Sequence, residues 1–427
     1  MRHPLRHPLR HPWPGVSLRA VGVAAALCLL LPAAVQACGS SRASSTASPP
    51  DAGPAGDASV TLDAAGGLDG PRAADAAGAG DAGAGGQVMA GPDATVSAFQ
   101  ATPIFFGPGK NQRTADSAVV FPALGAYQSI TLHLSLMCPP GGCDIWDRFG
   151  TLAVVRAGAA SDAGPGAEEL LEVARFVTPY GLPAASDPQP SWDIDVTELR
   201  PLLAGAVTLR AFIDTWVPQN VTNEGYGWQV TASFEMKGGI PARVPVAVVP
   251  IWTWTTTNKE PTQVVYGDPA LPIAQTLPPQ ALTLPAGASS YSVRSFITGH
   301  GQANLENCAE FCSRQHTWTV GTTANAKAVW RTDCGNYPSA GTYPDSRAGW
   351  CPGVNVDAWD FDVTDQVART GSTPFVYGVD PYLNTCNAGA DGGGPCTGCP
   401  AGASCAYDGA GHTQPFFYVS ALLIGYR

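Results

Sequence analysis

Ile130-Thr-Leu-His-Leu-Ser-Leu136 decides the fold class, because its strict alternation of apolar and polar residues is typical of a half-buried β-strand. A second strand is predicted downstream, at Thr151-Leu-Ala-Val-Val-Arg156. The connection between them, Cys138-Pro-Pro-Gly-Gly-Cys-Asp-Ile-Trp-Asp-Arg148, holds two cysteines, two carboxylates, a tryptophan and an arginine. The stretch therefore predicts two strands joined by a loop that carries reactive side chains.

The two cysteines of this loop predict a small disulfide ring. A ring of this size stabilises a protein by only about 2 kcal/mol, so stability alone is a weak reason for it. Holding Asp144 and Asp147 still at the rim of a sheet is a better reason, because catalytic groups need a fixed geometry. The alternative is that both acids are solvated loop residues and that Trp146 belongs to the core.

Short alternating runs, separated by Pro, Gly, Asn and Asp, continue through the rest of the chain. This pattern predicts an all-β protein of two adjacent eight-stranded antiparallel jelly-roll sandwiches, at 96–238 and 243–427. We expect the site in the groove between them, because ligand sites commonly occur at domain interfaces. A modest helix is predicted at 196–203. The other predicted strands are 118–121, 171–177, 207–213, 228–236, 244–252, 289–297, 316–320, 327–331, 359–363, 375–379 and 416–426.

The N-terminus indicates export. A basic stretch precedes an apolar segment that is too short for a convincing membrane span. Val35-Gln-Ala-Cys38 is similar to a bacterial lipobox, which predicts a lipoprotein signal peptide at 1–37 and lipidation of Cys38; ordinary cleavage after Ala37 is the alternative. We expect an exported protein, in the periplasm or as a lipoprotein of the outer membrane or cell surface, whose lipid anchor is its only contact with a membrane.

Residues 38–95 are rich in Ala, Gly, Asp and Pro and predict a disordered tether. The recurring Asp-Ala-Gly lacks the acid spacing of a calcium loop. The net charge of −11 and the absence of a basic stripe indicate that nucleic acid is not a partner.

The cysteines predict disulfides, which persist outside the cytosol. Of twelve, Cys28 leaves with the signal and Cys38 carries lipid, so an even number remains. A zinc or redox role for the pair at 396 and 399 is the disfavoured alternative, since no second paired motif accompanies it. The predicted bridges are Cys138–Cys143, Cys308–Cys312 and Cys334–Cys351, with Cys386, Cys396, Cys399 and Cys405 forming two more of unknown pairing in a Cys-rich loop at 384–408.

Three further clusters combine acids with aromatic or basic residues. They are Asp214-Thr-Trp216, Cys308-Ala-Glu-Phe-Cys312 and Asp345-Ser-Arg-Ala-Gly-Trp-Cys-Pro-Gly353. Sugar recognition uses such residues, since an aromatic face stacks on the pyranose ring and charged groups bond to hydroxyls. Each cluster alone could be structural, but together they favour a carbohydrate site.

With these motifs, the sequence resembles the bacterial peptide-N-glycosidase F family, exported two-jelly-roll amidases that remove N-linked glycans. The resemblance covers most of 98–380. The remaining motifs that carry it, in the same order, are Cys143-Asp-Ile-Trp-Asp-Arg148, Arg175-Phe-Val-Thr-Pro-Tyr180, Ile194-Asp-Val-Thr197, Leu202-Leu-Ala-Gly205 and Val246-Ala-Val-Val-Pro250.

The resemblance implies hydrolysis of the amide bond between Asn and the first GlcNAc of a glycoprotein or glycopeptide, by a monomer without metal or other cofactor. It gives Asp147 the position of the principal catalytic carboxylate, Glu310 that of the second acid, and Asp214 that of a third that acts through a water. It places Arg148 and Trp216 in the cleft and Trp350 beside it. The other residues predicted to bind substrate are Trp146, His300 and Arg347.

Three departures from the family pattern affect the expected specificity. Position 214 has Asp in place of Glu, and Thr298-Gly-His-Gly-Gln302 has His and Gln where Trp and His are expected. The loop from 386 to 405 has no known counterpart in the family. The glycans accepted can therefore differ even if the reaction does not.

Three other functions remain as alternatives. A catalytically weak glycan-binding lipoprotein would use the same scaffold, and a glycosidase that cuts between sugars would leave GlcNAc on the Asn. A copper monooxygenase would need clustered histidines. The sequence offers few, and two of them, His133 and His316, fall in predicted strands, where they are expected to be ordinary sheet residues.

Overall fold

The computed structural model describes residues 87–107, 110–157, 167–181, 189–217, 226–255, 261–268, 271–303, 306–336, 344–384 and 414–427. They belong to one compact unit, Gly78–Arg427. The signal, Cys38, most of the tether and the cysteines at 386, 396, 399 and 405 lie outside the described residues. Within them, no helix is long and apolar enough to cross a membrane.

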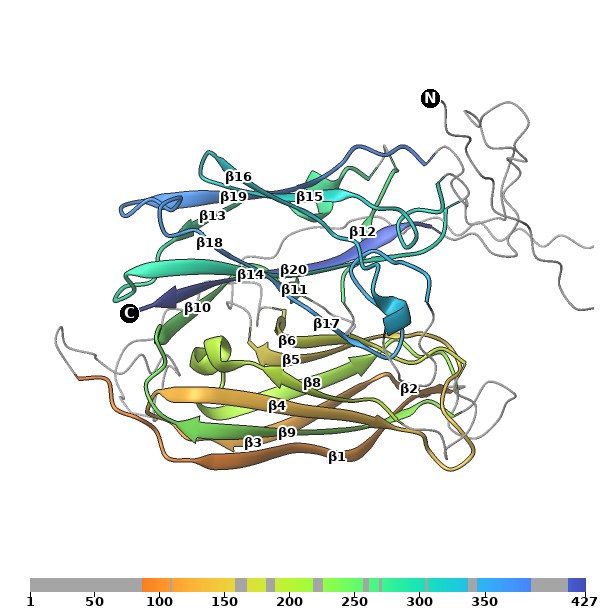
Figure 1. The fold of residues 1–427 in the computed structure, drawn as a ribbon, viewed down its shortest axis with the longest axis horizontal. Helices are drawn as coiled ribbons and strands as arrows, with labels where there is room; N and C mark the ends of the chain where they lie inside the picture. Colours follow the sequence, from red (N-terminus) through yellow and green to blue (C-terminus); the bar gives the residue numbers. More distant parts are fainter. Residues whose placement is uncertain are drawn as a thin grey trace, which may run out of the picture. The chain divides into compact units, whose positions relative to one another are not determined.

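Two sheets are built mainly from the first half of the unit (Figure 1). The first has the order β2-β1-β9-β4-β7, and the second β11-β6-β5-β8-β3, with β17 also on β6. Their strands are β1 (Ala94–Gly107), β2 (Lys110–Gln112), β3 (Thr114–Phe121), β4 (Tyr127–Met137), β5 (Phe149–Arg156), β6 (Glu169–Val177), β7 (Ser191–Asp195), β8 (Gly205–Ile213), β9 (Trp228–Gly238), β11 (Trp254–Thr255) and β17 (Asn355–Val356).

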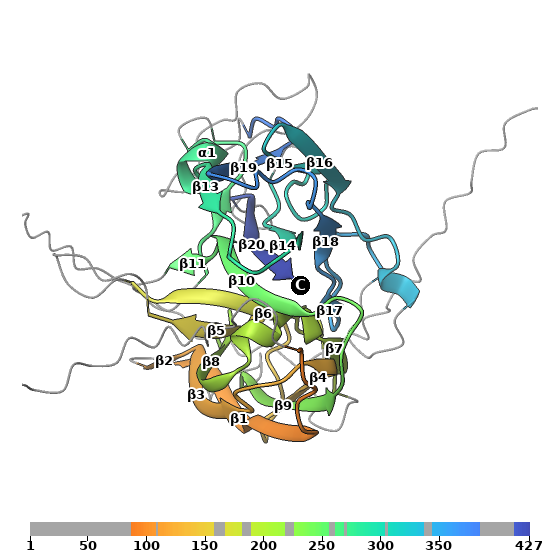
Figure 2. The same cartoon turned by 90° about the vertical axis from the view of Figure 1, so that its left-hand side faces the viewer.

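Two more sheets follow, in the orders β10-β20-β14-β18, with β12 also on β20, and β13-β19-β15-β16 (Figure 2). Their strands are β10 (Pro245–Trp252), β12 (Val264–Val265), β13 (Gln280–Thr283), β14 (Ser290–His300), β15 (Gln315–Val320), β16 (Thr323–Ala328), β18 (Trp359–Asp362), β19 (Ser372–Val379) and β20 (Phe416–Tyr426). The short helices are η1 (Thr197–Leu202), α1 (Ile273–Thr276) and η2 (Cys334–Asn336).

The all-β prediction is confirmed, and the paired strands of the described residues run antiparallel. The jelly-roll winding, the strand number of each sandwich and the division at 238 and 243 remain predictions. The predicted strand 327–331 is displaced, because β16 runs from Thr323 to Ala328; the strands predicted at 118–121 and 375–379 also begin earlier, at Thr114 and Ser372. Strand β16 pairs Thr323 with Val320 through a tight turn, so the preceding strand sets its start.

Strand β20 contributes to two cores at once. Leu422, Ile424 and Tyr426 belong to the core of the first two sheets, while Val419 and Leu423 belong to the core of the last two. Successive side chains of a strand point to opposite faces, so β20 must be apolar on both. This explains the nearly continuous apolar run at the C-terminus.

A buried ion pair fastens β6 to strands β14 and β20. Both Arg175 and Glu172 are buried, and the guanidinium donates two hydrogen bonds of 2.8 Å to the carboxylate. Arg175 also donates to Thr298 Oγ1 at 3.0 Å and to the carbonyl oxygen of Tyr418 at 2.8 Å, while Ser420 Oγ donates to Glu172. The network joins segments far apart in the sequence.

Glu172→Gln is expected to destabilise the protein by roughly 3 kcal/mol, because it leaves the buried charge of Arg175 without its counter-ion. The remaining acceptors, Thr298 and Tyr418, should still allow the variant to fold. Denaturant unfolding measures the difference. A free energy of unfolding equal to that of the wild type would show that the pair adds nothing to stability.

Candidate active site

The loop between β4 and β5 is held by the predicted disulfide Cys138–Cys143. Gly141 has a φ of 107°, and a Cβ at this position would lie 2.2 Å from the ring of Tyr226. Only glycine fits such a close approach in this conformation. The disulfide ring is thus tightly packed against Tyr226, and it begins the loop that carries Asp147.

Asp147 and Glu310 meet at a single arginine. Nη2 of Arg347 lies 3.8 Å from Oδ2 of Asp147, and Nε of Arg347 lies 3.1 Å from Oε1 of Glu310. The two carboxylate side chains are 20% and 12% exposed, so both are largely shielded from water. Residues separated by more than 160 positions are brought together at this guanidinium.

Glu310 is held by its own short ring. The predicted disulfide Cys308–Cys312 surrounds it, and its backbone N–H donates to the carbonyl of Gly301 at 3.0 Å. Its carbonyl accepts from the N–H of Ala348 at 2.9 Å, next to Arg347 in the chain. The third predicted disulfide, Cys334–Cys351, also forms. Three disulfides are compatible with an exported protein.

Both acids hold their protons more tightly than free carboxyl groups. Burial raises the pKa of Asp147 to about 6, although the nearby Arg347 opposes the shift. Burial, and next the charge of Asp147, raise the pKa of Glu310 to about 7. Two interacting carboxyl groups titrate as a pair, so near pH 6 to 7 the pair carries about one proton. Such a pair can supply one acid and one base.

Glu310→Gln is expected to stabilise the protein near pH 8 by up to about 3 kcal/mol, and to leave stability near pH 4 unchanged. The folded protein binds this proton more tightly than the unfolded chain, because the pKa of Glu310 is raised from 4.5 to about 7. Stability of the wild type therefore falls as pH rises between these values, and glutamine removes that loss. Melting temperatures across the pH range measure the effect; a variant less stable than the wild type near pH 8 would contradict it.

Asp214 lies at the end of β8, beside a different arginine. Its carboxylate is 2.8 Å from Nη1 of Arg113, whose guanidinium stands 4.0 Å from the centre of the Trp216 ring. Trp216 is 52% exposed and presents its ring to solvent. Sequence reasoning missed Arg113, since no motif surrounds it.

The structure contradicts the alternative in which Asp144 and Asp147 are solvated loop residues and Trp146 belongs to the core. Asp144 is fully buried, Asp147 is largely so, and Trp146 is 40% exposed next to Tyr180, with ring centroids 5.9 Å apart. The acids are therefore not solvated and Trp146 is not part of the core. Tyr180, within a quoted motif but not singled out, adds a second aromatic ring beside the loop.

Trp350 packs beside Arg347, and His300 packs on Trp350. Trp350 is 1% exposed, so the expectation that its ring lies at the substrate is corrected. It lies 5.0 Å from the guanidinium carbon of Arg347 and stacks on His300 at 5.5 Å. Burial, and next the charge of Arg175, lower the pKa of His300 to about 3, so this ring is neutral.

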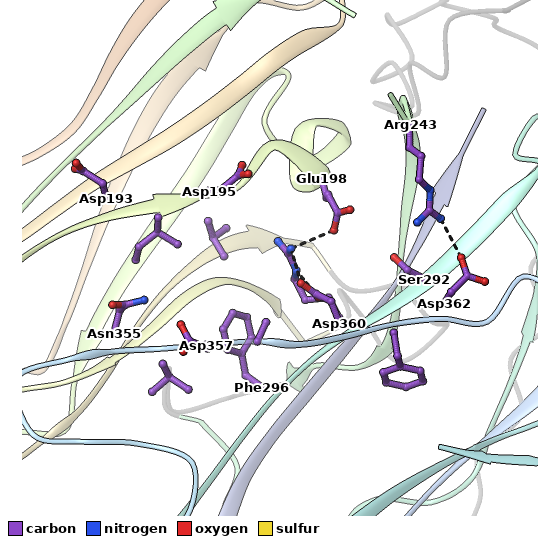
Figure 3. A pocket seen from close by; sticks show the side chains of 16 residues that line it. Asp193, Asp195, Glu198, Arg243, Ser292, Phe296, Asn355, Asp357, Asp360 and Asp362 are labelled. Carbon is purple, nitrogen blue, oxygen red and sulfur yellow. Dashed lines mark hydrogen bonds and ion pairs between the residues drawn. The ribbon is translucent and has the colours of Figure 1, made fainter. Parts of the chain in front are cut away.

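A separate groove of about 660 Å³ lies along β7, β14, β17 and β18 (Figure 3). Arg294 reaches Asp360 at 2.8 Å and Glu198 at 3.1 Å across it, and Arg243 lies 3.5 Å from Asp362. Its lining includes none of the acids predicted for catalysis. Among the described residues, no group of three or more His, Cys, Asp or Glu is arranged to hold a metal ion.

Family models match both halves of this arrangement. One, peptide-N-glycosidase F, N terminal, matches residues 95–224, and the other, peptide-N-glycosidase F, C terminal, matches residues 272–393. The chain belongs to the peptide-N-glycosidase F family. Asp147 and Asp214 lie in the first matched segment of this hydrolase, and Glu310 and Arg347 in the second.

Individual proteins are similar to the chain in sequence or in structure. Peptide-N(4)-(N-acetyl-beta-D-glucosaminyl)asparagine amidase F of Elizabethkingia miricola is 29% identical over 290 residues, 65% of this chain and 75% of that protein. PNGase F of Flavobacterium meningosepticum, described as a glycosylasparaginase, has a similar structure with a TM-score of 0.58 and 23% identity over 79% of this chain and 96% of its own. The structure of PNGF-II has a TM-score of 0.55 and 19% sequence identity, over 78% of this chain and 65% of its own. These two structural likenesses show the fold.

Proposed function

We propose that the protein is an exported peptide-N-glycosidase that hydrolyses the amide bond between Asn and the first GlcNAc of N-linked glycans. The observation that carries the proposal is the pair of shielded carboxylates, Asp147 and Glu310, joined by Arg347 in a member of the peptide-N-glycosidase F family. The amidase of Elizabethkingia miricola bears this activity in its name.

The raised pKa values of the two acids and their shared contact with Arg347 support the following assignment of roles. Asp147, with the lower pKa, is the base that takes a proton from water as the water oxygen attacks the side-chain carbonyl carbon of Asn. Glu310, with the higher pKa, holds a proton that it gives to the departing nitrogen of the glycosylamine. The carbon–nitrogen bond breaks and Asn becomes Asp. We assign to Arg148 the stabilisation of the negative charge that develops on the carbonyl oxygen.

The sugar is assigned to the exposed aromatic rings near the acids. Trp146 and Trp216 are 40% and 52% exposed, and an aromatic face is the usual partner of a pyranose ring. Asp214 supports this surface through Arg113, whose guanidinium packs on Trp216. The shorter side chain at 214 thus still holds one wall of the proposed site.

Incubation of the full chain with an Asn-linked glycopeptide tests the function. The expected result, by mass spectrometry, is a peptide in which Asn has become Asp, together with a glycosylamine that water then converts to the free glycan, with its reducing-end GlcNAc, and ammonia. A peptide that keeps one GlcNAc would identify a glycosidase. Unchanged glycopeptide bound to the protein would identify a glycan-binding protein, and either result would refute the amidase.

Anchoring is a separate part of the proposal. The lipobox-like segment ending at Cys38 supports a lipidated, envelope-bound enzyme. Membrane retention in a bacterial host that is lost in Cys38→Ala would support the anchor, and equal retention of both forms would refute it.

A further inference from the structure

Asp144 is a buried carboxylate that no part of the proposed reaction uses. It is fully buried, directly after Cys143, and three donors reach its two oxygens. The backbone N–H of Trp146 donates to Oδ1 at 3.0 Å, while Nε of Arg148 and Oγ1 of Thr215 donate to Oδ2, each at 2.7 Å. Asp144 thus joins the loop of Asp147 to the strand end that carries Asp214 and Trp216.

The backbone of the loop has other fastenings. Oγ1 of Thr178 accepts from the N–H of Arg148 at 2.7 Å and donates to the carbonyl of Trp146 at 2.8 Å. The disulfide holds the start of the loop. Burial of a carboxylate is costly, and a neutral group could have served the backbone alone. The interaction that needs a negative charge is the one with the guanidinium of Arg148.

Among the described residues, the guanidinium of Arg148 is hydrogen-bonded to protein through only one of its three nitrogens. Its Nε is engaged by Asp144, and within the described part of the chain its two terminal nitrogens have no hydrogen bond or ion pair. Arg148 follows Asp147, the proposed base, directly in the chain, and its positive charge lowers the pKa of that carboxyl group. A guanidinium fixed through Nε presents its remaining donors in one plane.

We propose that Asp144 is a positioning residue, which fixes the guanidinium plane of Arg148 toward the reacting amide. Through its hydrogen bond from Thr215, it also holds this guanidinium in a fixed orientation relative to Trp216. The inference rests on the proposed function, because it assigns the terminal nitrogens of Arg148 to the substrate. Thr215 takes part in this positioning, since its hydroxyl and Nε of Arg148 donate to the same oxygen of Asp144.

Asp144→Asn is the selective test. The amide oxygen can still accept from Trp146, and the hydroxyl of Thr215 can rotate to accept from the amide nitrogen. In this orientation the amide nitrogen faces Nε of Arg148, which cannot accept; in the flipped orientation Nε keeps an acceptor, but the negative charge that pairs with the guanidinium is gone. We expect kcat/KM for the Asn-linked glycopeptide to fall about 10- to 100-fold, because small displacements of catalytic groups have effects of this size.

A double-mutant cycle separates positioning from stability. In an Arg148→Met background, Asp144→Asn should lower kcat/KM by no more than about 2-fold, since the group it positions is gone. Glu172→Gln is the matched control: it removes the charge of another buried acid and should lower the melting temperature with kcat/KM within about 2-fold of the wild type. Equal losses of kcat/KM in both backgrounds would overturn the proposal.

Thr215→Val keeps the test available if Asp144→Asn does not fold. It removes one donor to Asp144 and should lower kcat/KM about 3- to 10-fold in the wild type, but not in Arg148→Met. A loss that persists in that background would also overturn the proposal. An inactive wild type would instead refute the proposed function, so the two failures are distinguishable.

Discussion

Asp147→Asn is expected to lower kcat/KM for glycan release by roughly 1,000-fold, because asparagine cannot take a proton from the attacking water. The fold should be retained, since the amide has the size of the carboxyl group and the ion pair that is lost, with Arg347 at 3.8 Å, is a long one. Steady-state kinetics on one glycopeptide, with circular dichroism of both proteins, measure the change.

Asp360→Asn is a suitable control for this variant. Asp360 pairs with Arg294 at 2.8 Å in the groove away from the predicted acids, and its loss should leave kcat/KM within about 2-fold of the wild type. Glycan release by Asp147→Asn at the wild-type rate would remove Asp147 from the mechanism.

Glu310→Gln is expected to lower kcat/KM by about 100- to 1,000-fold and to change its pH dependence. In the wild type, activity should rise as Asp147 ionises near pH 6 and fall as Glu310 loses its proton near pH 7. Glutamine neither holds nor releases that proton. The residual activity should therefore rise with pH and show no fall on the alkaline side.

The pH profiles of kcat/KM for wild type and variant test this assignment. An alkaline fall that persists in Glu310→Gln would mean that another group supplies the proton. Because the same variant is expected to be more stable near pH 8, lower activity there could not be attributed to unfolding.

The parts of the fold that follow from local pattern could be predicted from the sequence. The alternation at 130–136 appears as alternating burial along β4, and the predicted strand 416–426 matches β20. The helix predicted at 196–203 appears as the short helix η1. Three disulfides form between cysteines that are close in sequence. In each case the signal lies within a short stretch of sequence.

Burial of polar and aromatic side chains could not be predicted in the same way. Asp144 is buried because Thr215, 71 residues away, and Arg148 reach its oxygens. Trp350 is buried because His300 stacks on it, and this depends on how β14 passes the loop. Arg113 adjoins Trp216 only through the pairing of β3 with β8. Such contacts depend on register and on the packing of distant segments.

Glycopeptide hydrolysis in heavy-oxygen water is the most direct measurement of the central claim, that Asp147 directs water to the side-chain carbonyl of Asn. With the wild type, we predict one heavy oxygen in the new Asp of the peptide and none in the released glycosylamine before it hydrolyses to the reducing sugar. Asp147→Asn should give neither product. Heavy oxygen on the sugar, with the peptide still carrying its Asn, would place the attack on the glycan and contradict the account.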